Sequence, residues 1–557
     1  TISSDSTIGC FLVSDLFAQL GGEFVVISPG SRNAPLIKCF QSFDSIQCVS
    51  IVDERSAAFF ALGISLATKK PVALVCTSGT ALLNYSPAIA EAYYLGVPLI
   101  VISADRPGIR IDKGEGQSIR QQNVYQNFQK GFLNIEEEHC FEKEIVEKSK
   151  NILLNAISEK HGPVHFNLPF SEPLYEESEN NSKFDNVNFD TAIIETNLKL
   201  DLVYIERWNK SKRKLVLCGR LEKSNKLNQA LIELSKNSDI IILFESVSNL
   251  DSNCGIGTID RTLSALSIKD IQPDLVVTLG EHIISKRIKE FLKRIKNLEH
   301  WHISDNDELM DTFECKSLSI KTTAELFLEN INYQNIQKGS DYSNTWKTNE
   351  LIGKNLHNEF LLNVPFSDLQ VFDIVLNAIP NNFHLQSGNS SIIRYIQLFD
   401  YNQWKSCHAN RGTSGIEGST STAVGFSFAA KEPTLLITGD ISFLYDSNGL
   451  WNNSIRSDFR IIVINNGGGG IFRFIPGPET VPNHEEFFET THNIDLQRIA
   501  KAFGFDFGRA DNKNELIESL ESFFIPSIVP KILEIRTPRK LNSEILKEYF
   551  SYIEKNK

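Results

Sequence analysis

The sequence contains no segment suited to crossing a membrane and no excess of positive charge. No run of eighteen apolar residues occurs in its 557 residues, and no basic stretch followed by a short apolar one opens it. The net charge of -13 argues against nucleic acid or an acidic membrane as a partner, because both require a positive field. We therefore expect a cytoplasmic protein with no membrane segment that binds no nucleic acid.

Closely spaced cysteines are missing as well. Nine cysteines are scattered singly, with no CxxC motif and no histidines at the spacing typical of zinc sites. They are predicted to be reduced thiols in the core.

The order of apolar and polar stretches predicts an α/β fold. A chain of this length should form two to four domains. Apolar stretches followed by helical patterns predict strands at Glu23–Ser28, Gln47–Val52, Val72–Cys76, Pro98–Ser103, Lys214–Gly219, Ile240–Glu245, Leu275–Leu279 and Phe459–Ile464. This alternation is typical of doubly wound parallel sheets. We expect three such domains, at residues 1–180, 181–345 and 346–557.

Two polar stretches support these boundaries. Glu172–Asn197 is acidic and polar, and Asn335–Asn344 is a second polar run. The layout around Ser78-Gly79 and Pro98–Asp105 resembles that around Gly439-Asp440 and Phe459–Asn466. The first and last domains are therefore expected to share one topology.

The stretch Gly439–Phe472 predicts a metal-bridged diphosphate site. Asp440 follows one strand, and Asn466 with a run of glycines follows the next, so both loops should meet at the carboxyl edge of a sheet. A carboxylate, an amide oxygen and backbone carbonyls are the ligands that Mg2+ prefers. Neither loop matches the P-loop or the GxGxxG pattern. Each loop taken alone could equally be an ordinary turn.

The spacing of Gly-Asp and Asn-Asn resembles the motif with which thiamine-diphosphate enzymes hold their cofactor through Mg2+ (or Mn2+). The resemblance implies a thiamine-diphosphate-binding fold, with Asp440, Asn466 and the carbonyl of Gly468 as metal ligands. Ile441 stands where the motif usually has glycine. The other positions expected at the cofactor are Ser31, Gly388, Ser390, Ile416, Gly439, Ile441, Ser442, Ile471 and Phe472. Ile416 would bend the cofactor, and Phe472 would form an apolar wall beside it.

Glu54 stands just before an apolar helix pattern and has two interpretations. It could simply place negative charge in the first turn of that helix. The resemblance instead makes it the glutamate that exchanges a proton with the cofactor's aminopyrimidine, with a pKa raised by burial. In that family the site lies between the N-terminal domain of one subunit and the C-terminal domain of another. A homodimer or homotetramer is therefore implied.

Several further segments resemble the menaquinone-pathway synthases of 2-succinyl-5-enolpyruvyl-6-hydroxy-3-cyclohexene-1-carboxylate (SEPHCHC). They are Ser28–Leu36, Asp53–Gly63, Thr77–Ala92, Ser103–Pro107, Gly388–Arg394 and Asn410–Gly425. The resemblance implies decarboxylation of 2-oxoglutarate and addition of the remaining four-carbon unit to isochorismate. Catalytic roles fall to Glu54, Ser390, Arg394, Arg411 and Gln117, and substrate contacts to Ser31, Arg32, Arg106, Gln117, Lys286, Arg287, Arg394 and Arg411.

The substrates of that family are dicarboxylates, which an acidic protein can bind only with a local group of cations. Arg32, Arg106, Arg394 and Arg411 are expected in loops that face the cofactor, where arginine binds carboxylates with two parallel hydrogen bonds. Any one of them alone could be a surface ion pair.

Three alternatives remain at this point. No adjacent histidine pair occurs, although thiamine decarboxylases that release aldehydes often use one. Another carboligase similar to acetolactate synthase, a 2-oxoacid decarboxylase, or a non-catalytic cofactor binder stay possible.

Overall fold

The computed structural model describes residues 8–136, 142–172, 174–175, 189, 200–266, 271–306, 308–331, 340–400, 403–474 and 477–557. Most of the expected linker at Glu172–Asn197, part of the run at Asn335–Asn344, and Cys140 lie outside these residues. None of the described helices is long and apolar enough to cross a membrane.

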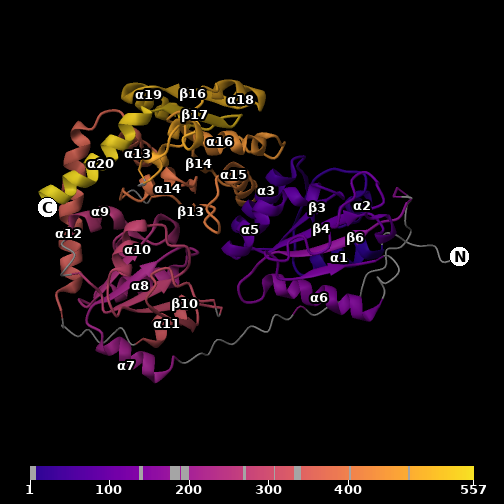
Figure 1. The fold of residues 1–557 in the computed structure, drawn as a ribbon, viewed down its shortest axis with the longest axis horizontal. Coiled ribbons are helices and arrows are strands. Elements are labelled where there is room, and N and C mark those ends of the chain that lie inside the picture. Colours follow the sequence, from indigo (N-terminus) through magenta and orange to yellow (C-terminus); the bar gives the residue numbers. More distant parts are fainter. Residues whose placement is uncertain are drawn as a thin grey trace.

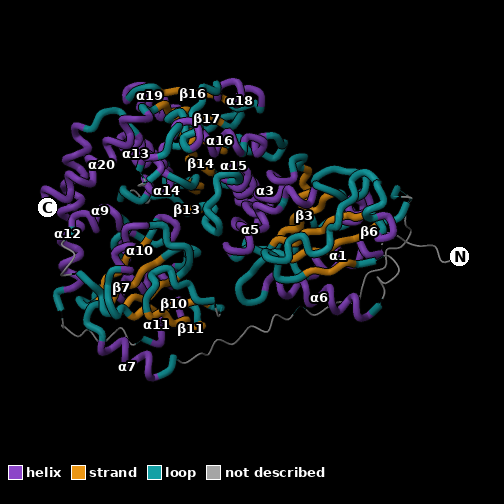
Figure 2. Tube along the Cα trace, in the orientation of Figure 1, coloured by secondary structure: helices purple, strands orange, loops and turns teal. Residues whose placement is uncertain are grey.

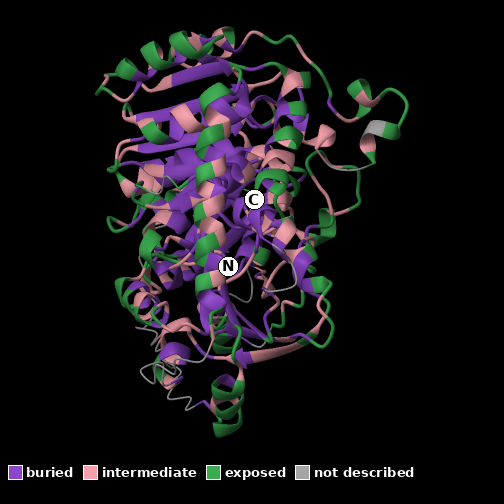
Figure 3. Ribbon diagram, turned by 90° about the vertical axis from the view of Figure 1, so that its left-hand side faces the viewer, coloured by how far each residue is buried: buried purple, intermediate pink, exposed green. Residues whose placement is uncertain are grey.

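Three parallel sheets form the framework of the described chain (Figures 1 and 2). The first contains β1 (Phe24–Ile27), β2 (Gln47–Ser50), β3 (Val72–Cys76), β4 (Leu99–Asp105), β5 (Phe132–Asn134) and β6 (Val164–Pro169). Its helices are α1 (Ile8–Gln19), α2 (Ala34–Gln41), α3 (Glu54–Thr68), α4 (Ala81–Asn84), α5 (Ser86–Leu95) and α6 (Lys143–Ile157). The central strands β3 and β4 are buried along their whole length, because helices cover both faces of a parallel sheet. Figure 3, seen from the left-hand side of Figure 1, shows the same pattern of buried strands and of helices with exposed outer faces.

The middle sheet contains β7 (Lys214–Cys218), β8 (Ile240–Phe244), β9 (Leu275–Leu279), β10 (Glu299–Ser304) and β11 (Lys316–Lys321). Around it lie α7 (Leu202–Lys210), α8 (Asn225–Leu234), α9 (Ile259–Ala265), α10 (Lys286–Lys293) and α11 (Ala324–Asn330). Its strand order is β11-β10-β9-β7-β8.

The third sheet contains β12 (His384–Ser387), β13 (Cys407–His408), β14 (Thr434–Gly439), β15 (Phe459–Asn465), β16 (Asp506–Ala510) and β17 (Lys531–Arg536). Its helices are α12 (Tyr342–Asn363), α13 (Asp368–Ala378), α14 (Ser391–Ile396), α15 (Ser419–Ala430), α16 (Asp440–Tyr445), α17 (His484–Phe487), α18 (Leu496–Ala502), α19 (Lys513–Phe523) and α20 (Arg539–Asn556). The expected division after residue 345 lies inside α12, so the domain limits stay a proposal.

The first and third sheets share one topology, which confirms the similarity expected from the sequence. Their orders are β2-β1-β3-β4-β6-β5 and β13-β12-β14-β15-β17-β16, and every pairing in the described sheets is parallel. All the predicted strands appear, two of them (Val72–Cys76 and Leu275–Leu279) with the predicted ends and the others with ends shifted by one or two residues. The stretch Ala81–Leu95 forms two helices and not a single one, because Pro87 cannot donate the backbone hydrogen bond of a helix interior.

Close helix packing joins the first and third sheets. A Cβ atom at Gly63 of α3 would lie 2.1 Å from the Thr422 carbonyl oxygen of α15, and one at Gly425 would lie 2.0 Å from that of Phe60. Only glycine permits this approach, and buried residues on both sides form one hydrophobic core.

The middle and third sheets are joined by a buried arginine. Arg261 on α9 is fully buried. It donates to both carboxylate oxygens of Asp400 at 3.0 Å and to Glu350 at 2.9 Å. Beside it, α12 and α20 run together along the junction (Figure 1).

Candidate active site

The carboxyl edge of the third sheet gathers the residues predicted to hold a cofactor. The chain leaves β12 at Gly388 and β14 at Gly439, and the strand order reverses between these two strands. Open parallel sheets bind their ligands at such a point. Gly439 pairs with Ile464 in the sheet, so the loops after β14 and β15 emerge side by side.

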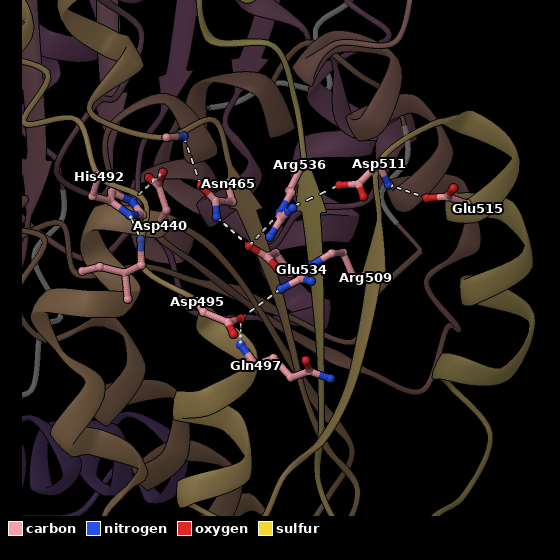
Figure 4. A network of polar contacts seen from close by, with 12 residues as sticks. Asp440, Asn465, His492, Asp495, Gln497, Arg509, Asp511, Glu515, Glu534 and Arg536 are labelled. Atoms are coloured by element: carbon pink, nitrogen blue, oxygen red, sulfur yellow. Dashed lines mark hydrogen bonds and ion pairs between the residues drawn. The ribbon is translucent and has the colours of Figure 1, made fainter.

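Asp440 links these two loops. It is the buried first residue of α16, and one carboxylate oxygen accepts the backbone N–H of Ile441 at 2.8 Å. The other oxygen accepts the backbone N–H of Gly468 at 2.9 Å and contacts the imidazole of His492 at 3.2 Å (Figure 4). The carboxylate therefore lies at the glycine turn, as the sequence predicted.

Asn466 presents an oxygen without a partner. Its amide nitrogen donates to Asp368 at 3.3 Å, and its Oδ1 is buried with no hydrogen-bond partner among the described residues. Asp368 is itself buried and accepts the hydroxyl of Thr537 at 2.6 Å. Since a buried amide oxygen is costly when it is left unpaired, its orientation suits a bound cation.

Hydrogen bonds of Asn465, the first residue of the Asn-Asn pair, fix the glycine turn to the sheet. Asn465 accepts the backbone N–H of Gly467 at 3.0 Å and donates to the buried Glu534 at 2.6 Å (Figure 4). Gly467 and Gly468 have φ of 76° and 154°, and a Cβ at Gly468 would lie 2.6 Å from the Glu489 carbonyl oxygen. The turn therefore requires glycine.

These residues fit a divalent cation that bridges a diphosphate. A carboxylate at Asp440, the unpaired oxygen of Asn466 and a backbone carbonyl at Gly468 would together supply an all-oxygen donor set, as Mg2+ and Mn2+ prefer. A Cβ at Gly439 would meet no atom within 4 Å, so its backbone is open to a phosphate group.

A second loop is fixed against this edge by Asn389. Its amide donates to two carbonyls of loop 410–415, at 2.7 and 2.6 Å, and accepts from Arg411 at 2.9 Å. Ser442 donates its hydroxyl to the Ile416 carbonyl at 2.7 Å. The neighbouring Ser390 has φ of 66°, a conformation rare outside glycine and common at functional sites.

A cavity of about 770 Å3 adjoins this edge and collects several predicted residues. Lys286 and Arg287 of α10, Arg394 of α14 and Ile471 line it, together with residues of α20. The Arg287 guanidinium lies 3.9 Å from the ring centroid of Phe550 on α20. Arg394 was expected in a loop, which is wrong, because the segment after Ser390 forms the helix α14.

Both cations and anions line the cavity: the cations are Lys286, Arg287, Arg394 and Lys547, and the anions are Asp260, Glu290 and Glu554. Burial lowers the pKa of Arg411, and the charge of Arg394 adds to this against the opposing charge of Glu245. Burial also lowers the pKa of Lys289, and the nearby cations add to this, again against Glu245. The mutual repulsion of these cations favours the binding of an anion among them.

A buried glutamate holds the helix that carries part of this charge. Glu245 accepts the backbone N–H groups of Ile284 and Ser285 just before α10, at 2.7 to 2.8 Å. Burial raises the pKa of Glu245 to about 7, against the opposing effect of these hydrogen bonds and of Arg411. Glu245 therefore fixes the start of α10.

Four predicted residues of the first domain do not line this cavity. Arg32 donates to the Phe170 carbonyl at 3.1 Å and to Glu172 at 3.0 Å, and Arg106 lies 3.5 Å from Glu115. Ser31 and Gln117 are exposed. Within the described chain, no hydrogen bond or ion pair joins these four residues to Arg394 or Arg411.

A series of hydrogen bonds between buried polar side chains positions two loops of the first domain. Gln121 accepts the backbone N–H of Gly79 at 2.8 Å and donates to Asn167 at 2.8 Å. Asn167 donates to Asp105 at 2.8 Å, and Asp105 accepts the backbone N–H of Arg106 at 2.7 Å. The turn at Gly79 and the loop of Arg106 are thereby held in one arrangement.

Glu54 is the half-buried first residue of α3. The cap of that helix is Asp53, which accepts the Ser56 N–H at 3.2 Å, so Glu54 is not needed as the cap. Burial raises the pKa of Glu54, and Asn84 donates to it at 3.4 Å. The raised pKa is the direction that a proton-exchanging acid requires.

The sequence did not reveal the residues that hold these groups in place. Asp368, Glu245, Gln121 and Lys289 lie outside the segments that resemble the family, and Asn389 lies inside one of them, Gly388–Arg394, where no role was expected for it. Lys289 could have been found, because it follows Lys286 by almost one helical turn and so lies on the same face of α10. The others act across long sequence separations.

Comparison with family models gives three consecutive matches. The N-terminal TPP binding domain of thiamine pyrophosphate enzymes matches residues 9–127, the middle domain of thiamine pyrophosphate enzymes residues 190–385, and the C-terminal TPP binding domain residues 387–535. TPP is thiamine pyrophosphate, the same compound as thiamine diphosphate.

Curated relatives match over nearly the full chain. The 2-succinyl-5-enolpyruvyl-6-hydroxy-3-cyclohexene-1-carboxylate synthase of Christiangramia forsetii is 43% identical, over 95% of this chain and 96% of its own. Proteins of the same name from Flavobacterium johnsoniae and Porphyromonas gingivalis are 43% and 39% identical, over 94% and 98% of this chain and 95% and 97% of theirs.

A solved structure shows the same fold at low identity. The benzoylformate decarboxylase of Polynucleobacter necessarius superposes with a TM-score of 0.72 and 16% identity, covering 95% of this chain and 98% of its own.

Proposed function

The chain belongs to the SEPHCHC synthase family of thiamine-diphosphate enzymes, and we propose that it joins 2-oxoglutarate and isochorismate in a site shared by two subunits. The family resemblance expected from the sequence is confirmed. The chain is an enzyme of menaquinone biosynthesis, and thiamine diphosphate is its cofactor. The observation that carries the choice of substrates is the cation group beside the metal-binding edge.

Asp440, Asn466 and the Gly468 carbonyl would hold Mg2+ or Mn2+ between protein and diphosphate. Asp368 would orient Asn466, because it takes the amide N–H and leaves the amide oxygen to the metal. Gly388, Gly439, Ile441, Ser442 and Phe472 would surround the cofactor. When bound, thiamine diphosphate supplies the nucleophilic carbon and the electron sink for decarboxylation of a 2-oxoacid.

Glu54 would hold a proton at its carboxyl group and exchange it with the cofactor's pyrimidine nitrogen. Its burial favours the protonated form at a pH where an exposed glutamate is ionised. Ile416 and Ser442, joined by their hydrogen bond, would fix the wall against which the cofactor bends.

The cations would bind the substrate carboxylates. The cavity is lined by Arg394, Lys286 and Arg287. Arg411 and Lys289 lie close enough to Arg394 for their charges to repel it. Each charged hydrogen bond to a carboxylate contributes about 1.5–3 kcal/mol. Ser31, Arg32, Arg106 and Gln117 would reach the substrates from the first domain of the partner subunit.

The surface around Glu54 supports a shared site. The side chains of Val52, Leu83, Tyr445 and Trp451 near it are 42–52% exposed, although all four are large and apolar. Arg55, next to Glu54, donates to the Tyr445 carbonyl and covers its ring at 4.8 Å. A patch of this kind is typical of a protein interface. A second copy of the chain would bury it and desolvate Glu54 further.

We propose a cytoplasmic location, as expected from the sequence, because its nine cysteines are scattered singly with no CxxC motif.

The proposed substrates can be tested by measuring carbon dioxide release. The enzyme is supplied with cofactor, Mg2+ and either 2-oxoglutarate or pyruvate, each with and without isochorismate. We expect release from 2-oxoglutarate, faster when isochorismate is present. Faster release from pyruvate would instead favour an acetolactate-type reaction, and release of a free aldehyde without isochorismate would favour a decarboxylase. If neither acid releases carbon dioxide although the cofactor is bound, the result would favour a non-catalytic cofactor binder.

A further inference from the structure

Three side chains that the proposed reaction does not use meet at the amino edge of the middle sheet. His300, the second residue of β10, lies directly opposite Ser317 of β11. Cys315 precedes Ser317 by two residues and therefore lies on the same face. Asp311 comes from the loop before β11. His300, Asp311 and Cys315 each offer one atom that could bind a metal, and these three atoms lie within 4.8 Å of one another.

These three groups converge on one hydroxyl. The Ser317 oxygen lies 2.8 Å from the Nδ1 of His300, 2.8 Å from a carboxylate oxygen of Asp311 and 3.7 Å from the Sγ of Cys315. A hydroxyl has a single proton and can donate to only one of them at a time. A cation between these groups could be bound by all three side chains and by the hydroxyl oxygen at the same time.

The surroundings orient the histidine for such a role. Its Nε2 is hydrogen-bonded to the Thr278 hydroxyl on β9 at 2.9 Å, which leaves Nδ1 to face the other two groups. Histidines that bind metals usually have their second ring nitrogen held in this way. The ring of Phe313 packs edge-on at 4.9 Å, so the inner side is apolar. His300 is buried, Cys315 half-buried and Asp311 exposed, which leaves an entry for an ion.

We propose that His300, Asp311 and Cys315 bind one Zn2+ ion or a similar borderline metal, with the Ser317 hydroxyl as fourth ligand. The mixture of nitrogen, sulfur and oxygen donors selects zinc over Mg2+ or Ca2+, which take oxygen ligands. On binding, the thiol loses its proton to solvent and a sulfur–metal bond forms. The ion would tie the loop before β11, an edge strand, to the sheet. Because the ligands are spread over two strands and a loop, no sequence motif marks them.

The test uses the full-length protein freed of metal and titrated with Co2+, then Zn2+. We expect one equivalent of Co2+ to produce the near-ultraviolet absorption of a cobalt–thiolate bond, which Zn2+ abolishes by displacement. The oxygen ligands at Asp440 and Asn466 cannot produce this band, so the result is independent of the proposed function.

Three variants sharpen the test. Cys315→Ser should lose the band and weaken Zn2+ binding more than about tenfold. Cys48→Ser removes the other half-buried described cysteine and should leave the band unchanged. Ser317→Ala should keep the band, because the thiolate remains. Absence of the band in the unmodified protein, or an equal band in Cys315→Ser, would show that the cluster is held by hydrogen bonds alone.

Discussion

Complementation between two inactive variants tests whether the active site is shared by two subunits. Glu54→Gln removes the proposed proton-exchanging acid and keeps its shape, so we expect kcat to fall by about 10²–10⁴. Asp440→Ala removes a proposed metal ligand and should also be nearly inactive. Each variant alone is impaired in every site, whatever the arrangement of the subunits.

The structure sets the expected result for a mixed dimer. Glu54 belongs to the first domain and Asp440 to the third. The neighbours of Glu54 contact the opposite end of α16 from Asp440: Arg55 donates to its last residue, Tyr445, and Asp53 accepts from Asn448 just after it. If sites are shared, one site of the mixed dimer carries both substitutions and the other carries none. Its activity should therefore be about half that of the unmodified dimer.

The assay uses two tags. The variants are co-expressed with different affinity tags, the mixed dimer is purified on both, and carbon dioxide release from 2-oxoglutarate is measured with isochorismate present. If each chain contains its own site, both sites of the mixed dimer are defective. Activity no higher than the mean of the two variant dimers would refute the shared site.

The remaining predictions concern the metal, the cations and a buried acid. Asp368→Ala should weaken Mg2+-dependent cofactor binding about 10–100-fold in a calorimetric titration, because Asn466 loses its orientation; unchanged affinity would contradict its role. Arg394→Ala should raise KM for 2-oxoglutarate or isochorismate about 10–100-fold with little change in melting temperature, whereas a collapse in melting temperature would indicate a structural role. The pKa of Glu245 is raised from 4.5 to about 7 in the fold, so the folded chain binds that proton more tightly than the unfolded chain. Its contribution to stability is therefore highest below pH 4.5 and falls by up to about 3 kcal/mol as the pH rises through 7. Glu245→Gln should flatten this part of the pH dependence in denaturant unfolding, and an unchanged slope would count against the assignment.

The strands and the cofactor motif could be predicted because they depend on local sequence. Strands such as Val72–Cys76 are continuous apolar runs, which the burial of parallel strands on both faces requires. The adjacency of the loops after β14 and β15 could be predicted because both follow strand ends of one βαβ unit. Pro87 shows the limit of predictions from the apolar pattern, because it divides a helix that this pattern alone would continue.

The supporting contacts could not be predicted, because they join residues far apart in the chain. Glu91 on α5 accepts backbone N–H groups of Gly412 and Thr413 at 2.7 Å and so holds the loop of Arg411. Asn389 and Gln121 act in the same way. Their residue types are common in turns, and only the packing of the three sheets gives them a role.

The most direct test of the account is a single incubation with thiamine diphosphate, Mg2+, 2-oxoglutarate and isochorismate, followed by mass spectrometry. Isochorismate should be consumed, and a product should appear with the mass of both substrates joined, less carbon dioxide. Glu54→Gln should form almost none of this product while still binding the cofactor. Unchanged isochorismate in the presence of bound cofactor would contradict the proposed reaction.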